Sequence, residues 1–222
     1  MDFVKEIQLT DNTSIKIYEA RKEILDYILN NFENIFNLHP VNPNNEKSKI
    51  MLYNKNINKP DWNELIVNRW YNSYLKTPLF DKQYKKSYMF SGKDKKEILN
   101  DIPDIIKPLY ECILSIDNRY NQVVINWYEK ENDYITLHSD WNDGMIDNYN
   151  IGVMSLYGIN DKIRNFEIVN KKTNEKIIIE LTNGIFIQMC GDFQNEFRHQ
   201  VPKISDNDII SKRVSISFRQ YK

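Results

Sequence analysis

Residues 122–219 decide the fold, because eight short apolar-rich runs follow one another there: QVVINWY (122–128), DYITLHS (133–139), NIGVMSLYG (150–158), RNFEIVN (164–170), KIIIELT (176–182), GIFIQMC (184–190), EFRHQV (196–201) and RVSISFR (213–219). Turn-forming residues separate the runs. Short strands at spacings of about 8 to 12 residues are typical of two-sheet barrels and jelly rolls. The sequence therefore predicts an α+β protein whose second half is a jelly roll, also called a double-stranded β-helix.

The residues before this stretch predict helices that cover one sheet of the jelly roll. Apolar side chains recur at helical spacing over residues 21–37, and a second helical pattern begins at Pro103 and runs to about Ile116. Proline is favoured in the first turn of a helix. Two alternating segments, FVKEIQL (3–9) and SIKIYEA (14–20), indicate strands ahead of the first helix. We expect these N-terminal elements to buttress the jelly roll.

Composition excludes several classes of protein. Hydrophobic residues make up 41% of the 222 residues and aromatic residues 13%, which is enough for a core and argues against a disordered chain. No apolar run reaches the roughly 18 to 20 residues of a membrane helix, and the start MDFVKEIQLT lacks the features of a signal peptide. We therefore expect a soluble intracellular protein, cytoplasmic or nuclear. With a net charge of −1, any nucleic-acid site must be a local basic patch.

Two of the three histidines lie inside the predicted jelly roll, at His138 and His199. His138 begins the triplet His138-Ser139-Asp140, and residues two apart on a strand face the same way. A second imidazole, from a strand across the barrel, would complete a set of two histidines and one carboxylate. Such a set occupies one face of the Fe(II) coordination sphere and leaves the other positions open. The triplet alone is weak support, since an isolated histidine is more often a core or surface residue.

Arginine is scarce in this chain, which makes its positions informative. Only seven of the 30 cationic residues are arginine, and three of these, Arg198, Arg213 and Arg219, lie in the last 25 residues. Arg213 and Arg219 are six residues apart on one predicted strand, so both face the same side, where a dicarboxylate could be clamped. The alternative is two surface arginines on an edge strand.

Together these motifs resemble the AlkB-like Fe(II)- and 2-oxoglutarate-dependent dioxygenases, over about residues 84–222. The family's order of motifs is matched by Asn126-Trp127-Tyr128, His138-Ser139-Asp140, the strand IGVMSLYG, the strand that begins at Gly184, His199 followed by Val201-Pro202, and the terminal arginines. The resemblance implies that His138, Asp140 and His199 bind iron. It also implies that Asn126, Tyr128, Arg213 and Arg219 bind 2-oxoglutarate, with Arg213 and Tyr128 at the distal carboxylate. No catalytic side chain beyond the metal ligands is implied.

An upstream segment, Ser87-Tyr88-Met89-Phe90-Ser91-Gly92, is similar to one found in family members that act on duplex DNA. The resemblance implies that Phe90 and His138 sandwich a base flipped out of its stack, with Tyr88, Ser91 and Gly92 beside it. Ordinary strand aromatics are the alternative. Residues 82–96 carry six lysines and a single acid, Asp94, which favours phosphate contact, although most charge runs are solvated surface.

The sequence departs from the family pattern at three places. Trp141-Asn142-Asp143 stands where base-reading members have an acidic stretch, so only Asp143 remains to contact the base. Ser215 stands where asparagine is usual between the two arginines, and Pro60-Asp61 replaces a Pro-Arg element. The base that is read and the substrate-recognition lid are therefore expected to differ.

The function that we predict is oxidative demethylation of N-alkylated bases, of the 1-methyladenine or 3-methylcytosine type, in DNA or RNA. It would use Fe(II), O2 and 2-oxoglutarate and release succinate, CO2 and formaldehyde. Residues 1–222 are expected to form one monomeric domain, with recognition elements up to about residue 120 and the catalytic core from about 121. The alternatives are a 2-oxoglutarate-dependent hydroxylase or demethylase of a protein or small molecule, and a jelly-roll binding module without turnover.

Overall fold

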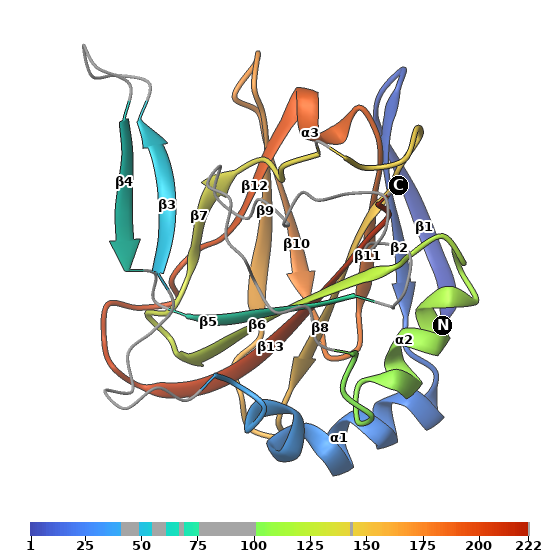
Figure 1. Ribbon diagram of the computed structural model, residues 1–222, viewed down its shortest axis with the longest axis vertical. Coiled ribbons are helices and arrows are strands. Elements are labelled where there is room, and N and C mark those ends of the chain that lie inside the picture. Colours follow the sequence, from blue (N-terminus) through green and yellow to red (C-terminus); the bar gives the residue numbers. More distant parts are fainter. Residues whose placement is uncertain (41–48, 55–60, 67–68, 76–100, 143, 222) are drawn as a thin grey trace.

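A computed structural model describes residues 1–40, 49–54, 61–66, 69–75, 101–142 and 144–221 (Figure 1). The strands are β1 (Asp2–Thr10), β2 (Thr13–Glu19), β3 (Lys49–Asn54), β4 (Asp61–Ile66), β5 (Trp70–Leu75), β6 (Gln122–Lys130), β7 (Ile135–His138), β8 (Ile151–Tyr157), β9 (Arg164–Asn170), β10 (Lys176–Leu181), β11 (Phe186–Gly191), β12 (Phe197–Val201) and β13 (Ile210–Arg219). The helices are α1 (Lys22–Phe36), α2 (Lys107–Leu114) and α3 (Phe193–Glu196). Each of the eight runs that the sequence predicted as a strand overlaps one of the strands β6 to β13.

Two antiparallel sheets form the body of the protein. The large sheet has seven strands in the order β1-β2-β11-β8-β13-β6-β5, and the small sheet has four in the order β10-β9-β12-β7. Strands β3 and β4 form a separate hairpin. Consecutive strands of the second half alternate between the two sheets at several points, as in a jelly roll, and this agrees with the predicted fold class.

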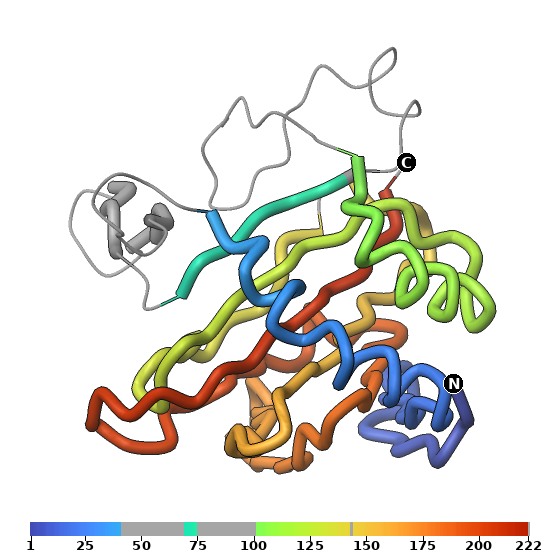
Figure 2. The backbone as a smooth tube through the Cα atoms, turned by 90° about the horizontal axis from the view of Figure 1, so that it is seen from below, coloured from blue at the N-terminus to red at the C-terminus, as the bar shows by residue number. Residues whose placement is uncertain are grey.

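Helices α1 and α2 cover the outer face of the large sheet (Figure 2). Buried residues of α1 recur at helical spacing, and the indole N–H of Trp127 on β6 donates to the carbonyl of Ile35 at 3.0 Å. The sequence placed the start of the second helix at Pro103, which was wrong. The carbonyl of Pro103 accepts bonds from Ile106 and Lys107 in a preceding turn, and Pro108, which lacks an N–H, lies in the first turn of the helix itself.

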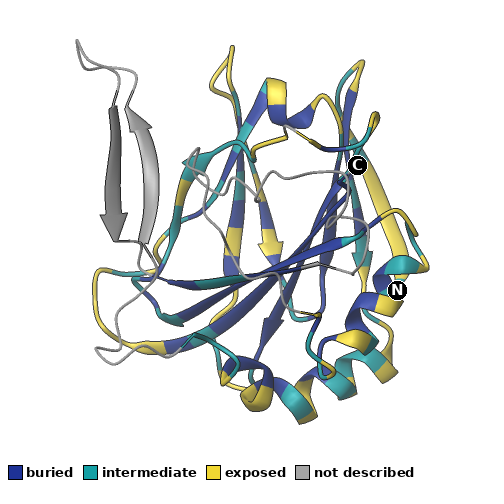
Figure 3. Cartoon of the chain, in the orientation of Figure 1, coloured by how far each residue is buried: buried dark blue, intermediate teal, exposed yellow. Residues whose placement is uncertain are grey.

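The central strands of the large sheet are buried along most of their length (Figure 3), so alternation of side chains decides which residues face the helices and which face the small sheet. The cluster under the helices takes every second residue of two strands, Val123, Ile125 and Trp127 of β6 and Val214, Ile216 and Phe218 of β13. The residues that alternate with them, Tyr128 and Arg213 included, therefore face the small sheet. A second apolar cluster fills part of the same space, with Val153, Ile168 and Ile187 among its members.

The segment 87–92 lies outside the described residues, as does Pro60 of the predicted recognition lid, whereas Asp61 begins β4. Also outside the described residues are Tyr88, Phe90, Ser91, Gly92 and Asp143, the five residues predicted to bind substrate. Among the residues that are described, no helix is long and apolar enough to cross a membrane.

Asp117 joins the turn after α2 to the end of β13. Its carboxylate accepts hydrogen bonds from the side chains of Arg119, Asn150 and Gln220. Burial alone would raise the pKa of Asp117, but these bonds outweigh burial and lower the pKa to about 2. Gln220 follows Arg219 directly, so this network fixes the chain next to a predicted site residue.

Replacing Asp117 with asparagine should lower the free energy of unfolding by about 1 kcal/mol near neutral pH, since the network is partly solvated. A carboxyl whose pKa is depressed on folding stabilises the protein above its ordinary pKa of 3.8, and this contribution is lost as the pH falls through about 2. Urea unfolding of both proteins should therefore show a difference near neutral pH that shrinks towards about pH 2. Asp11→Asn, at an exposed turn, is the control and should unfold like the wild type.

Candidate active site

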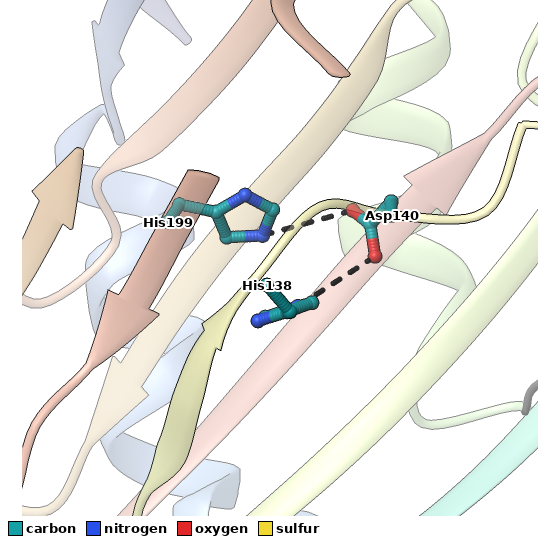
Figure 4. Close-up of side chains that lie close together, drawn as sticks. All are labelled: His138, Asp140 and His199. Atoms are coloured by element: carbon teal, nitrogen blue, oxygen red, sulfur yellow. Dashed lines mark ion pairs between the residues drawn. The ribbon is translucent and has the colours of Figure 1, made fainter. Parts of the chain in front are cut away.

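His138, Asp140 and His199 converge between the two sheets (Figure 4). Strand β7 ends at His138, Asp140 follows two residues later, and His199 on β12 is the antiparallel partner of His138. The Nε2 atoms of both histidines lie 3.8 Å from the Asp140 carboxylate, one from each oxygen. One ligand atom from each residue lies within 4.8 Å of the other two. The structure thus brings together the three predicted metal ligands.

The donor set fits a divalent metal ion. Nδ1 of His138 lies 2.7 Å from the carbonyl of Thr136, and because a carbonyl only accepts, this nitrogen carries the proton and leaves the Nε2 lone pair facing Asp140. Burial lowers the pKa of His138 to about 4 and that of His199 well below its ordinary value, so both are neutral ligands near pH 7. Two neutral imidazoles and one carboxylate are the ligands of a non-haem Fe(II) face.

Asp140 is held by two groups besides the histidines. Its backbone N–H donates to Oε1 of Gln194 at 2.8 Å, and its Oδ1 accepts a bond from Nη2 of Arg219 at 2.7 Å. Burial raises the pKa of the Asp140 carboxyl to about 7, and the positive charge of Arg69 opposes that rise. A divalent cation would oppose it further, because it favours the ionised form of the carboxylate that binds it.

The site opens to solvent on one side. The side chain of His138 keeps 28% of its surface exposed, whereas that of His199 keeps 6%. His199 lies against Phe166 and Phe193, with ring centroids 5.3 and 6.0 Å away. A substrate would therefore approach past His138.

Residues predicted to bind 2-oxoglutarate line the same inter-sheet space. Arg213 is 1% exposed, lies over the ring of Tyr128 at 4.9 Å from the centroid, and donates from Nη2 to the hydroxyl of Ser155 at 2.9 Å. Arg219 lies farther along β13, at the metal ligand Asp140. The two guanidinium groups therefore mark two ends of one space, with Tyr128 at the end away from the triad.

A family model described as the 2OG-Fe(II) oxygenase superfamily matches residues 39–219, a span that contains the triad and both terminal arginines. The chain belongs to the 2OG-Fe(II) oxygenase superfamily. It is therefore a dioxygenase that uses Fe(II) and 2-oxoglutarate, as predicted. When bound, these two groups supply the oxidising chemistry.

The fold of this oxygenase is also found among solved structures. One described as "The structure of OsALKBH1" has a TM-score of 0.52 and 14% sequence identity, over 96% of this chain and 100% of that chain. At this identity the likeness concerns the fold, and it agrees with the AlkB-like jelly roll predicted from the motifs. A search of curated protein sequences finds no match.

Sequence reasoning missed two residues of the oxygenase site. Gln194 lies on the four-residue helix α3, which the sequence did not predict. Arg69 precedes β5, is 2% exposed, and donates from Nε to Oδ1 of Asn126 at 3.0 Å. With its oxygen occupied, the Asn126 amide turns its NH2 group away from Arg69, where it can donate to a bound carboxylate or keto oxygen. The scarcity of arginine was the signal that could have found Arg69.

Replacing Gln194 with alanine should weaken iron binding by about tenfold, because outer-shell partners of metal ligands typically contribute 10- to 100-fold in affinity. The change leaves the buried N–H of Asp140 without its acceptor and frees the carboxylate to move. Competition with a metal chelator under anaerobic conditions would measure the loss. The matched control is Gln200→Ala: Gln200 adjoins His199 but bonds Glu167 instead. Equal affinities in the two variants would contradict the role given to Gln194.

Proposed function

We propose that this oxygenase demethylates N-alkylated bases, such as 1-methyladenine or 3-methylcytosine, in DNA or RNA. The observation that carries the proposal is the segment 87–92, which resembles the base-stacking segment of DNA-acting AlkB-like enzymes, in a chain whose iron site opens past His138. The neighbouring lysines of residues 82–96 support it, because phosphate contacts dominate nucleic-acid affinity. The proposal treats residues 1–222 as a single domain, since β1, β2 and β5 complete the large sheet.

Each residue of the proposal has one task. His138, Asp140 and His199 would hold Fe(II). Asn126, Tyr128, Arg213 and Arg219 would hold 2-oxoglutarate, with Arg213 and Tyr128 at the distal carboxylate. Tyr88, Phe90, Ser91, Gly92 and Asp143 would receive the base.

The reaction balances without further reductant. One oxygen atom of O2 enters 2-oxoglutarate, which loses CO2 and becomes succinate, and the other oxidises the N-methyl group to N-hydroxymethyl. That group releases formaldehyde and leaves an N–H on the base. The protein positions the methyl group and excludes water. The low pKa of both histidines keeps them from acting as proton donors near pH 7.

A second candidate keeps the iron and 2-oxoglutarate but acts on a protein or small molecule. The observation that favours it is Trp141-Asn142, which replaces acidic residues in the stretch that would face a cationic base. Trp141 is 46% exposed beside the metal ligand Asp140, so an apolar group is offered to the substrate there.

Mass spectrometry of an oligonucleotide that carries 1-methyladenine, incubated with Fe(II), ascorbate and 2-oxoglutarate, tests the proposal. We expect a loss of one methyl group per modified base, together with succinate. Reactions without 2-oxoglutarate and with unmodified oligonucleotide are the controls. Succinate that forms at the same slow rate with and without alkylated DNA or RNA would favour the second candidate.

Reversing Lys85, Lys86, Lys95 and Lys96 to glutamate should weaken oligonucleotide binding and flatten its dependence on salt, because fewer counterions are released. Uncoupled turnover of 2-oxoglutarate should persist, since the metal ligands and terminal arginines are unchanged. Fluorescence anisotropy at several salt concentrations would measure both. The matched control reverses four exposed lysines elsewhere, Lys5, Lys22, Lys172 and Lys203, and has the same net charge. Identical salt slopes in the two variants would remove the lysine run as a phosphate site.

A further inference from the structure

Two buried guanidinium groups from opposite sheets meet at one tyrosine ring. Arg164 is the first residue of β9 in the small sheet, and Arg213 lies on β13 in the large sheet. Both are 1% exposed. Their Cζ atoms lie 5.8 and 4.9 Å from the centroid of Tyr128. The two charges are therefore enclosed together between the sheets.

Each guanidinium group uses only part of its hydrogen-bonding capacity within the described part of the chain. Nη2 of Arg164 donates to the carbonyls of Asp133 and Pro202, both at 2.6 Å, while its Nε and Nη1 are buried without a partner. Nη2 of Arg213 donates to Ser155, and its Nε and Nη1 are likewise buried without a partner. Four N–H-bearing nitrogens on the two arginines thus have capacity for a further acceptor in a space closed to water, and the protein group within hydrogen-bonding reach of Arg213 there is the hydroxyl of Tyr157.

No carboxylate pairs directly with the two charges in this space. Neither arginine forms an ion pair with a carboxylate of the described residues. Asp133, whose charge acts on Arg164 without a direct ion pair, accepts bonds from the backbone N–H groups of Glu129 and Lys130. The charge of Arg213 adds to burial in lowering the pKa of Arg164, which shows that the two groups are close. Buried charges without partners are costly, so this arrangement requires an anion when the site is in use.

A tyrosine hydroxyl completes the polar lining. The Oη of Tyr157 on β8 accepts a bond from the backbone N–H of Arg164 at 3.1 Å, so it lies at the root of that side chain. Both arginines oppose the rise that burial causes in the pKa of Tyr157, which places this hydroxyl near both guanidinium groups. Its proton remains available to a further acceptor in the same space.

We infer that Arg164 and Arg213 together clamp the distal carboxylate of 2-oxoglutarate, one from each sheet. The inference rests on the assignment of Arg213 made under the proposed function, and it adds Arg164, which the family resemblance did not assign. A carboxylate has two oxygens and about four lone-pair sites, enough to accept from both forks at once. Arg164 is thereby a specificity residue: it favours 2-oxo acids that end in a second carboxylate.

Binding of two ligands to the Mn(II)-loaded protein, measured by anaerobic calorimetry, tests the inference. One ligand is 2-oxoglutarate, and the other is 2-oxopentanoate, which has the same chain length but no distal carboxylate. In Arg164→Met we expect 2-oxoglutarate to bind about tenfold more weakly or worse, which corresponds to about 1.4 kcal/mol. The affinity for 2-oxopentanoate should stay within about twofold of the wild-type value, since this ligand has no distal carboxylate for Arg164 to contact. Arg21→Met, an exposed arginine that pairs with Asp2, is the matched control and should bind both ligands like the wild type.

Each outcome of the calorimetry tests a different part of the inference. An equal loss for both ligands would mean that Arg164 acts only through the carbonyls of Asp133 and Pro202, and the inference would fall. Loss of 2-oxoglutarate binding in Arg213→Met but not in Arg164→Met would keep the assignment of Arg213 and overturn that of Arg164. No loss in either variant would overturn both. If Arg164→Met does not fold, Arg164→Lys is the substitute, because it keeps the charge and one carbonyl bond. In Arg164→Lys we expect the affinity for 2-oxoglutarate alone to fall threefold or more, because an ammonium lacks the planar fork of a guanidinium.

Discussion

Replacing His138, Asp140 or His199 with alanine is expected to reduce the turnover of 2-oxoglutarate to background, whatever the prime substrate is. A face of two imidazoles and one carboxylate has no spare ligand, so the loss should exceed the roughly 10- to 100-fold that follows loss of an outer-shell partner. Among the described residues, these three form the one cluster whose ligand atoms could hold a metal ion. Succinate formation and bound iron after anaerobic loading are the measurements.

The three variants should fold, because the apolar clusters on both sides of the large sheet do not include these residues. Circular dichroism and the urea midpoint would verify this. Gln200→Ala, next to His199 on β12, should retain iron and turnover. Full iron occupancy together with full activity in any one alanine variant would remove that residue from the metal site.

The three positions should differ in their effect on the co-substrate. Asp140→Ala also removes the ion pair to Arg219, at 2.7 Å, whereas His199→Ala leaves that pair intact. We therefore expect Asp140→Ala to change 2-oxoglutarate binding to the metal-free protein more than His199→Ala does. The comparison separates the carboxylate's role as a ligand from its role as an anchor for Arg219.

Much of the site could be predicted from the alternation of apolar and polar residues along one strand. Because side chains alternate across a strand, the apolar residues Val214, Ile216 and Phe218 predict that the residues next to them, from 213 to 219, face the other way. The structure places Arg213 and Arg219 there, as expected. Six residues on a strand span about 20 Å, so the two guanidinium groups cannot meet at one carboxylate. Their separation instead puts Arg219 at Asp140 and Arg213 at Tyr128.

The parts that the sequence did not reveal depend on contacts between distant segments. Arg69 and Asn126 are 57 residues apart, and Gln194 and Asp140 are 54 apart. Arg164 stood in a predicted strand, but its position at a strand end gave no sign that it would reach Tyr128. Such pairings arise from the curvature of two sheets around one space, which no local pattern encodes.

Replacing Arg213 is expected to raise the concentration of 2-oxoglutarate needed for half-maximal turnover. For Arg213→Lys we expect about tenfold or more, because an ammonium cannot reproduce two parallel bonds from a planar fork, and one charged hydrogen-bonded contact contributes about 1.4 kcal/mol or more. Arg213→Met removes the charge as well and should cost more. The reaction rate at saturating 2-oxoglutarate should change less than the half-saturating concentration, since the triad is untouched.

The burial of Arg213 is the reason to expect a large effect on 2-oxoglutarate binding. The side chain is 1% exposed and touches Tyr128 and Ser155, so water cannot replace the fork once it is lost. Titrating 2-oxoglutarate while following succinate would measure the effect, with Arg21→Lys as the control at an exposed arginine. With 2-oxopentanoate in place of 2-oxoglutarate, wild type and Arg213→Lys should become similar, because the group that the arginine holds is absent. An unchanged half-saturating concentration in Arg213→Lys would place the distal carboxylate elsewhere between the sheets, and Tyr128 would lose its assignment with it.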